Sequence, residues 1–396
     1  MFLNESRLRN GMAQLRLDAV VATTPENVTY MSGFWAMPQW IRRGPQTYVV
    51  WPADGKGPSE IITSTSTLDL VADQGPWIEK IRRCGDFHVE HNETPYTTVD
   101  RRHIELRNAP AHSDALAALV AALTEDGLTR GMVAIDEAGL ELGYFDELKT
   151  RLPRVTWLPA AALLRKVRAV KTTEEVERLR GAAGIAERSI KAALTVATEG
   201  AREIDLARAF HVQTVQDGAM PVLGCIGFGE RSAMANVQPS DRKLRLGDVI
   251  RFDVGGRFRH YRADIARVAV LGNPSNEIRR LHSALLRGVQ HACQIIRPGM
   301  PAAKVFEEVM HEVQREGIAR YKRDHVGHGI GIDGYDAPSL SARSKERIEE
   351  GMVLCIETPY YEIGRWGLQV ENMVVVRSDG AESLMTTDGD LMVLPS

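Results

Sequence analysis

Four acidic residues and one histidine in the second half of the chain have the side-chain types and surroundings of a metal site. They are Asp253, Asp264, His328, Glu357 and Glu371. Each acid lies in or beside apolar, β-branched sequence, where burial of a carboxylate requires a compensating partner. Four carboxylates and one imidazole form a hard, oxygen-rich ligand set, whereas a structural zinc site favours cysteine. The set therefore predicts two divalent ions, with manganese, cobalt, zinc and iron all compatible.

The first two acids are expected on facing strands of a hairpin. Asp253 lies in Val-Ile-Arg-Phe-Asp-Val-Gly-Gly, and Asp264 lies eleven residues further on, before an alternating run that starts at Ile265. A hairpin would bring the two carboxylates together. Their charges would repel each other unless a cation lay between them.

The other three candidates are also expected in or beside strands. His328 lies between Gly327 and Gly329, which permit close approach of another backbone segment. Glu357 follows one apolar run, and Glu371 precedes another. Taken singly, a strand acid is most often solvated and a histidine among glycines is most often a turn residue. The joint order of the five residues favours a metal site.

These motifs resemble the pita-bread metallohydrolase family, in the branch of Xaa-Pro aminopeptidase, prolidase and creatinase that is related to methionine aminopeptidase. The matching sequences are Phe-Asp-Val-Gly, Gly-His-Gly-Ile-Gly, Ile-Glu-Thr-Pro-Tyr-Tyr, Gly-Leu-Gln-Val-Glu-Asn and, near the N-terminus, Pro-Glu-Asn-Val-Thr-Tyr-Met-Ser-Gly-Phe. The resemblance covers the whole chain. It implies an α+β pita-bread catalytic domain over residues 166–396, preceded by a smaller, creatinase-like α/β domain over residues 1–165.

The resemblance also implies a role for each candidate ligand. Asp253 would chelate one ion, while Asp264 and Glu371 would bridge both. His328 and Glu357 would complete the second ion's ligands. The ions would activate a water molecule as the nucleophile and polarise the scissile carbonyl, and Glu357 would pass a proton to the leaving nitrogen.

His325, three residues before His328, is a second candidate proton carrier. The chain departs from the family pattern at positions expected to contact the substrate. Asn236 and Tyr335 stand where two histidines are usual, Gln369 stands where an arginine is common, and a threonine interrupts the usual glutamate-proline pair. Asn236 and Tyr335 can donate hydrogen bonds but do not titrate near neutral pH as imidazole does. The metal site is therefore expected to be intact and the substrate contacts altered.

Three functions follow from this pattern. The favoured one is a dinuclear metal-dependent hydrolase that cleaves a C–N amide or peptide bond in a small substrate, with an Xaa-Pro dipeptide as the family default. The second is a non-peptidase on the same fold, either a metal-free amidinohydrolase like creatinase or a metal-dependent lyase like those that cleave dimethylsulfoniopropionate. The third is a catalytically inactive binding protein. The complete ligand set argues against creatinase chemistry and inactivity, and the missing histidines leave the lyase or a non-proline hydrolase open.

Further candidate substrate contacts lie outside these motifs. Residues 34–43 include Trp35 and Trp40, and they form either a recognition loop or a patch packed on its own domain. In the family branch that the chain resembles, this region reaches the active site of the neighbouring subunit, so a homodimer is expected. His260 and Tyr261 lie between the two ligand aspartates and are candidates to point into the site, although a solvated hairpin tip is the simpler interpretation.

Composition fits a two-domain globular enzyme, because 396 residues with 44% hydrophobic and 26% charged side chains can form two ordinary cores. A net charge of −3 with scattered basic residues gives no basis for binding nucleic acid. No apolar stretch has the length of a signal-peptide core or a membrane span. Four widely separated cysteines, Cys84, Cys225, Cys293 and Cys355, indicate free thiols in a reducing cytoplasm.

Periodicity predicts alternating helices and strands in the N-terminal domain and mainly helices around the ligand strands in the C-terminal domain. The N-terminal helices are expected over residues 6–17, 111–125 and 140–152, the strands over 19–23, 47–51, 60–63 and 132–135, and a surface loop over 88–101. A capping box formed by Thr172 and Glu175 predicts a helix running to about residue 198. Three more helices are expected over residues 203–216, 276–296 and 302–316.

Overall fold

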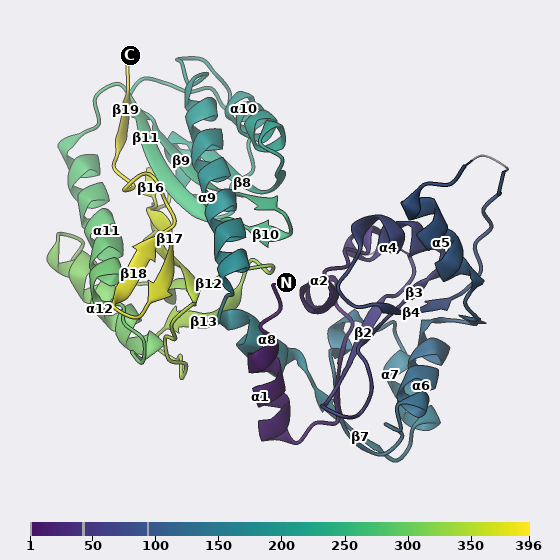
Figure 1. Cartoon of the computed structure of the whole chain (residues 1–396). Coiled ribbons are helices and arrows are strands. Elements are labelled where there is room, and N and C mark those ends of the chain that lie inside the picture. Colours follow the sequence, from purple (N-terminus) through teal and green to yellow (C-terminus); the bar gives the residue numbers. More distant parts are fainter. Residues whose placement is uncertain (1, 42–43, 93–94) are drawn as a thin grey trace. The chain divides into compact units, whose positions relative to one another are not determined.

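The computed structural model describes residues 2–41, 44–92 and 95–396. The chain divides into two compact units, Met1–Val167 and Arg168–Ser396 (Figure 1). Each unit has its own hydrophobic core around its own sheet. Among the described helices, none combines the length and apolar composition needed to cross a membrane.

The N-terminal unit is built on a mixed seven-stranded sheet with the order β5-β4-β3-β2-β1-β6-β7. Strand β2 pairs antiparallel with β1 and β3, and the remaining pairs are parallel. The strands are β1 (Ala19–Ala22), β2 (Tyr48–Pro52), β3 (Glu60–Ser64), β4 (Lys80–Cys84), β5 (Ala111–His112), β6 (Gly131–Ile135) and β7 (Val155–Pro159). The accompanying helices are α1 (Glu5–Leu15), α2 (Pro25–Ser32), α3 (Met37–Trp40), α4 (Leu68–Gln74), α5 (Thr98–Asn108), α6 (Ala115–Glu125), α7 (Tyr144–Arg151) and α8 (Ala161–Ala169).

Two predictions for this unit are corrected by local capping. The loop expected over residues 88–101 ends early, because Thr97 and Asp100 form a capping box that starts α5. Only Leu106 of α5 is buried, so the helix carries almost no apolar periodicity by which to recognise it. The helix expected from residue 111 begins later, because the Asp114 side chain caps it by accepting from the Ala117 backbone N–H at 2.7 Å.

The C-terminal unit contains a ten-stranded sheet whose main path is β10-β9-β11-β17-β14-β12-β13. Strands β8, β18 and β19 pair with β9, β17 and β11, respectively, and β15 and β16 form a separate ribbon. The strands are β8 (Met220–Phe228), β9 (Val249–Phe258), β10 (Tyr261–Arg262), β11 (Ile265–Leu271), β12 (His325–Gly329), β13 (Asp336–Ser341), β14 (Val353–Glu357), β15 (Tyr360–Glu362), β16 (Trp366–Leu368), β17 (Glu371–Arg377), β18 (Gly380–Ser383) and β19 (Met392–Leu394).

Four long helices accompany this sheet: α9 (Thr173–Leu194), α10 (Glu203–Gln216), α11 (Asn276–Ile295) and α12 (Ala302–Arg315). The predicted capping box is present, because the Thr172 hydroxyl accepts from the Glu175 backbone N–H at 3.3 Å and the Glu175 carboxylate accepts from the Thr172 N–H at 2.8 Å. Helices α9 and α10 pack together, as do α11 and α12 (Figure 1). The apolar faces of α11 and α12 join the central strands in one core, which gives the ligand-bearing strands a rigid support.

Candidate metal centre

Strands of the C-terminal sheet carry four of the five predicted ligands. Strands β9, β17, β14 and β12 contribute Asp253, Glu371, Glu357 and His328, whereas Asp264, expected on a strand, lies immediately before β11 in the short connection from β10. Asp253 and Glu371 share one register partner on β11, and Glu357 pairs directly with Glu371. Residues that are far apart in the sequence are thus brought together by backbone pairing.

The ligand atoms converge inside the unit. Oxygens of Asp253, Asp264 and Glu371 all lie within 4.8 Å of one another. His328 Nε2 lies 3.8 Å from Asp264 Oδ2. Asp264 is 9% exposed, His328 3% and Glu371 2%, so most of this group is removed from water.

The hydrogen bonds of the group leave ligand atoms available for a cation. His328 Nδ1 donates to the Gly329 carbonyl at 3.0 Å, which leaves the Nε2 lone pair directed away from the backbone. Within the described residues, His328 Nε2 and Asp264 Oδ1 are buried without a hydrogen-bond partner. An imidazole nitrogen and a carboxylate oxygen left unpaired side by side fit a divalent ion of the predicted kinds.

The pKa values of the acids also indicate a site for a cation. Burial raises the pKa of Asp253 to about 6. Burial, followed by the charges of Asp253 and Glu357, raises the pKa of Asp264 well above its usual value. Burial and the neighbouring carboxylates likewise raise the pKa of Glu371. These acids cannot all remain charged together unless positive charge is placed among them.

Glycines beside His328 allow strands to approach closely, as predicted. Gly327 has φ +144°, and a Cβ on it would lie 2.1 Å from the Cys355 carbonyl oxygen on β14. A Cβ on Gly329 would lie 2.1 Å from the Ala337 carbonyl oxygen. A side chain at either position would push β12 away from its neighbours and displace His328.

His325 contacts the metal-site acid Glu357, as its candidate role requires. Its Nδ1 lies 3.1 Å from Glu357 Oε1, and its side chain is 30% exposed. Burial alone would raise the pKa of Glu357, but the hydrogen bond and charge of His325 hold that pKa below its usual value. The same contact raises the pKa of His325. The pair can therefore hold a proton between a buried acid and the solvent.

Two residues in this region were not recognised as site residues from the sequence. Cys355 was counted only as a free thiol, yet its Sγ lies within 4.8 Å of ligand atoms of His328 and Glu371. Arg251 is fully buried, and its Nη1 lies 3.2 Å from Asp253 Oδ2. The signal for Arg251 was its position two residues before Asp253, because alternate residues of a strand point to the same face.

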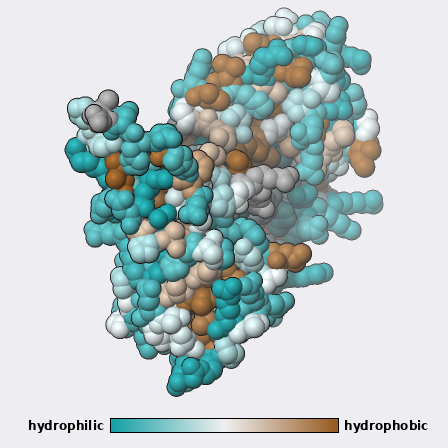
Figure 2. Space-filling view, turned by 90° about the vertical axis from the view of Figure 1, so that its right-hand side faces the viewer, coloured by the Kyte–Doolittle hydropathy of each residue, from teal (hydrophilic) through white to brown (hydrophobic). Residues whose placement is uncertain are grey.

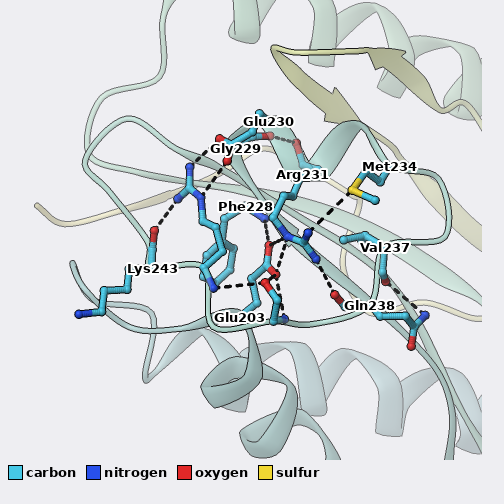
Figure 3. A network of polar contacts seen from close by, with 12 residues as sticks. Glu203, Phe228, Gly229, Glu230, Arg231, Met234, Val237, Gln238 and Lys243 are labelled. Atoms are coloured by element: carbon cyan, nitrogen blue, oxygen red, sulfur yellow. Dashed lines mark hydrogen bonds and ion pairs between the residues drawn. The ribbon is translucent and has the colours of Figure 1, made fainter.

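The loop that carries Asn236 is held by a buried acid. Glu203 accepts from the Phe228 backbone N–H at 2.9 Å and from Arg231 Nε at 2.9 Å, and Arg231 Nη2 donates to the Gln238 carbonyl at 2.8 Å (Figure 3). Glu203 also accepts from Ser240 through its backbone N–H and its hydroxyl. Asn236 itself lies exposed in a turn between these anchors.

Tyr335 lies against the metal-site histidine. Its ring stacks on His328 with a centroid separation of 3.9 Å, while 58% of the residue remains exposed. The next residue, Asp336, is fully buried and accepts from Arg168 Nη2 at 2.7 Å and from Lys171 Nζ at 3.4 Å. A solvent-facing ring is thus fixed by a buried charge cluster immediately beside it.

Gln369 belongs to the metal-site group, whereas the hairpin residues do not contact it through the bonds that the structure describes. Gln369 Nε2 donates to Glu371 Oε2 at 3.3 Å. Tyr261 is not solvated as expected: it is buried, and its hydroxyl donates to Glu175 Oε1 at 3.0 Å. His260 lies in the β9–β10 turn with φ 76°, and burial lowers its pKa to about 4. The turn contacts α9 through Arg178 Nη1, which donates to the Arg259 carbonyl at 3.0 Å, while Arg259 itself stays exposed at the tip.

The tryptophans of the N-terminal unit make contacts within that unit. Trp40 Nε1 donates to Thr29 Oγ1 at 3.1 Å, and the Trp35 backbone N–H donates to Gln74 Oε1 at 2.8 Å. Both tryptophans are partly buried. Arg42 and Arg43 of the same predicted segment lie outside the described residues.

A largely antiparallel sheet that collects four carboxylates and a histidine, preceded by an α/β unit, defines a two-domain metallohydrolase. Known proteins agree with this class. The model of metallopeptidase family M24 matches residues 177–378, and that of the Creatinase/Prolidase N-terminal domain matches residues 6–170. The chain therefore belongs to metallopeptidase family M24, and the predicted pita-bread fold with a creatinase-like N-terminal domain is confirmed. Family membership implies a peptidase that uses divalent metal ions.

Individual relatives cover much or all of the chain. An Xaa-Pro dipeptidase from Pyrococcus furiosus is 31% identical over 233 residues, which are 58% of this chain and 67% of that protein. The solved structure of an Xaa-Pro dipeptidase from Bacillus anthracis has a TM-score of 0.81 at 21% identity and covers 98% of both chains. Dipeptidase PepE from Mycobacterium ulcerans has a TM-score of 0.78 at 25% identity and covers 99% of this chain and 97% of that one.

Proposed function

We propose that this protein is a dinuclear metallopeptidase that cleaves the amide bond of a small substrate, with Xaa-Pro dipeptides as the first class to test. The observation that carries the proposal is the convergence of Asp253, Asp264 and Glu371, with His328 Nε2 3.8 Å from Asp264 Oδ2. His328 Nε2 and Asp264 Oδ1 are buried without a hydrogen-bond partner among the described residues. Arg251 contacts Asp253 at 3.2 Å, but one guanidinium does not balance the buried carboxylates of Asp253, Asp264 and Glu371, which argues against a metal-free enzyme or an inactive binding protein.

In this proposal, Asp253, Asp264, His328, Glu357 and Glu371 would together hold the two ions. Manganese, cobalt, zinc and iron remain the candidate metals, because their relative occupancy depends on supply as well as on ligands. The ions would supply Lewis acidity and lower the pKa of water toward neutrality.

The protein's own groups manage the proton. Glu357 is buried next to the reaction centre, and His325, partly exposed at 3.1 Å from it, connects that carboxylate to solvent. Glu357 would accept a proton from the attacking water and deliver it to the leaving nitrogen, and His325 would stabilise the ionised carboxylate before the first transfer and after the second. His325 is therefore a positioning residue for Glu357 in this scheme.

The substrate class is proposed from the relatives and from the open side of the site. Relatives named Xaa-Pro dipeptidase share the family and fold, which supports a dipeptide substrate. Tyr335, stacked on His328 and exposed, provides an aromatic surface and a hydroxyl beside the metal centre. Asn236, on its anchored turn, is the second candidate contact, and Gln369 is the third.

A second candidate function keeps the metal centre but changes the reaction. Neither Asn236 nor Tyr335 is a histidine, and Tyr335 covers the His328 ring directly. This arrangement favours a non-peptide substrate, cleaved by a lyase such as those acting on dimethylsulfoniopropionate or by a different amide hydrolase. The two candidates differ in the product that is released, not in their need for metal.

We also propose a cytoplasmic homodimer in which Trp35 and Trp40 contribute to the neighbouring subunit's site. Figure 2 shows hydrophobic residues as separate brown groups on a largely hydrophilic face. Support for a subunit contact comes from exposed Val212 and Val215 on α10, and from Met220 on the adjacent strand β8. All four cysteines are free, which suits a reducing compartment. Light scattering of the purified protein tests the dimer.

The decisive experiment combines metal reconstitution with a substrate panel. Metal-free protein is reconstituted separately with manganese, cobalt or zinc and assayed for proline release from Xaa-Pro dipeptides. The panel includes non-proline dipeptides and dimethylsulfoniopropionate. Metal-dependent proline release supports the first candidate, and metal-dependent turnover of another compound alone supports the second. A chain that binds no metal contradicts both.

A further inference from the structure

Arg251 is a fully buried arginine inside the metal-binding sheet. It lies on β9, two residues before Asp253, and its side chain has no exposed surface. Burial of a guanidinium is unfavourable unless each of its donors finds an acceptor. The groups that accept hydrogen bonds from such a guanidinium are therefore the groups whose positions it can fix.

One end of the guanidinium contacts the metal-site acids. Arg251 Nη1 donates to Asp253 Oδ2 at 3.2 Å and to Gln369 Oε1 at 2.8 Å. Gln369 then donates from Nε2 to Glu371 Oε2 at 3.3 Å. Arg251 thus reaches two of the predicted ligands, one directly and one through the Gln369 amide.

The other end of the guanidinium contacts the loop before Asn236. Arg251 Nε donates to the Ser232 carbonyl at 2.9 Å, and Nη2 donates to the carbonyls of Met234 at 2.7 Å and Ala235 at 3.0 Å. The next residue is Asn236, a candidate substrate contact. All three guanidinium nitrogens are therefore used, and the planar fork joins a metal-site strand to a substrate-side loop.

We propose that Arg251 is the positioning residue of this centre, which orients Asp253 and, through Gln369, Glu371 for metal binding and couples them to the loop that presents Asn236. This inference rests on the proposed metal site. It places on β9 a fixed positive charge directly beside Gln369, which stands where an arginine is common in the family pattern. Lysine could not replace it, because a single ammonium cannot reach acceptors on opposite sides of the fork.

The geometry suggests a relocation test. Gln369 Oε1 touches the guanidinium, so an arginine at position 369 would extend into the space that a shorter side chain at position 251 leaves empty. The double variant Arg251→Met/Gln369→Arg returns a guanidinium to the two acids from β17's side. It does not return the contacts with the carbonyls of Ser232, Met234 and Ala235. The double variant therefore tests the contacts with the two acids in the absence of the contacts with the loop.

The experiment measures manganese binding to metal-free protein by titration calorimetry, without any substrate. We expect Arg251→Met to weaken manganese binding by about 10- to 100-fold, the usual effect of removing a residue that orients a ligand. The double variant should recover at least about tenfold of that loss. Arg82→Met is the matched control, because Arg82 is also a largely buried arginine but its carboxylate partners, Glu60 and Glu125, lie in the N-terminal unit.

Thermal unfolding, measured in parallel, separates positioning from general stability. The control should lower the unfolding temperature while leaving manganese affinity unchanged. The proposal is overturned if Arg251→Met binds manganese as tightly as, or more tightly than, the wild type, or if the double variant recovers nothing. Failure of the wild type itself to bind manganese, cobalt or zinc would instead refute the proposed function, so the two failures are distinguishable.

Discussion

The strands that carry the predicted ligands and the loops that face substrate differ in how firmly the fold determines them. Asp264, His328 and Glu371 are buried. His328 and Glu371 are placed by backbone register across adjacent strands, and Asp264 lies directly before β11. Asn236 and Tyr335, in contrast, are exposed on connections between elements. Substitution of a candidate ligand disturbs a packed sheet, whereas substitution on the loops changes only the surface that contacts the substrate.

This difference separates chemistry from specificity. The candidate ligands are held by the part of the molecule that tolerates least change. Two of the residues that depart from the family pattern, Asn236 and Tyr335, lie on exposed connections, whereas a third, Gln369, is buried beside Glu371. Arg251 joins the two regions, since its guanidinium contacts both Asp253 and the loop before Asn236. The following experiments test this difference between the two regions.

The largest effect is expected from Asp264→Asn. The amide removes a negative charge and a bridging oxygen from the centre of the ligand group, so metal-dependent turnover should fall by more than the roughly 10- to 100-fold caused by loss of a supporting residue. Asp241→Asn, at a side chain that is 83% exposed, is the control and should retain activity. Steady-state turnover with reconstituted metal is the measurement, and an active Asp264→Asn enzyme would contradict the assigned role.

Loss of the buried anchor beside Tyr335 should mainly affect stability. Asp336→Ala leaves the buried Lys171 without the carboxylate it pairs with and leaves Arg168 with only the half-exposed Asp333 at 3.6 Å, and uncompensated buried charge typically costs about 3–5 kcal/mol. Denaturant unfolding of the metal-free protein measures the change. If stability is unchanged, the exposed tyrosine is not held by this cluster, and the contrast between the two regions is weaker than described.

A buried acid outside the metal group provides a pH test. Burial raises the pKa of Glu175 to about 7, above the value of 4.5 that it has without burial, so between these values the folded state binds more protons than the unfolded state. This group's contribution to stability is therefore greatest at low pH and falls as pH rises from about 4.5 to 7, by up to roughly 3 kcal/mol. Glu175→Gln should remove this part of the pH dependence, measured as the difference in unfolding free energy between variant and wild type. A constant difference across that range would refute the shift.

The smallest effect is expected from Tyr335→Phe. The ring remains able to stack on His328, and only the hydroxyl is lost, which corresponds to about 0.5–1.5 kcal/mol if it donates to the substrate. We expect a change in kcat/KM of no more than about tenfold, with unchanged metal content. A loss of bound metal in this variant would mean that Tyr335 belongs to the metal region instead of the substrate region.

Candidate metal ligands could be picked out of the sequence more readily than candidate substrate contacts, for a physical reason. Acids inside apolar strands, such as Glu357 and Glu371, are conspicuous because burial makes them costly, and strand pairing then leaves little freedom in where they meet. Asn236 is an ordinary polar residue in a turn, and its sequence surroundings contain no comparable constraint. The capping box at Thr172 could also be recognised in the sequence, because capping depends on residues only three positions apart.

The errors came from contacts between distant residues. The sequence around Tyr261 predicts a solvated turn, because its contact with Glu175 on α9 involves a residue 86 positions away. Arg251 was not recognised as a site residue, because the groups that accept its hydrogen bonds are distributed along the sequence from Ser232 to Gln369. Helix α5 was missed for the opposite reason, since it buries only one residue and has little tertiary pattern to detect.

The most direct test of the account is the metal content of the wild type beside Asp264→Asn. Metal-free samples are dialysed against manganese, cobalt or zinc, washed, and analysed for bound metal per chain by elemental analysis, with circular dichroism to confirm folding. The account predicts two ions per wild-type chain and a clear loss of bound metal in the folded variant. No bound metal in the wild type, or equal metal in the two proteins, would contradict it.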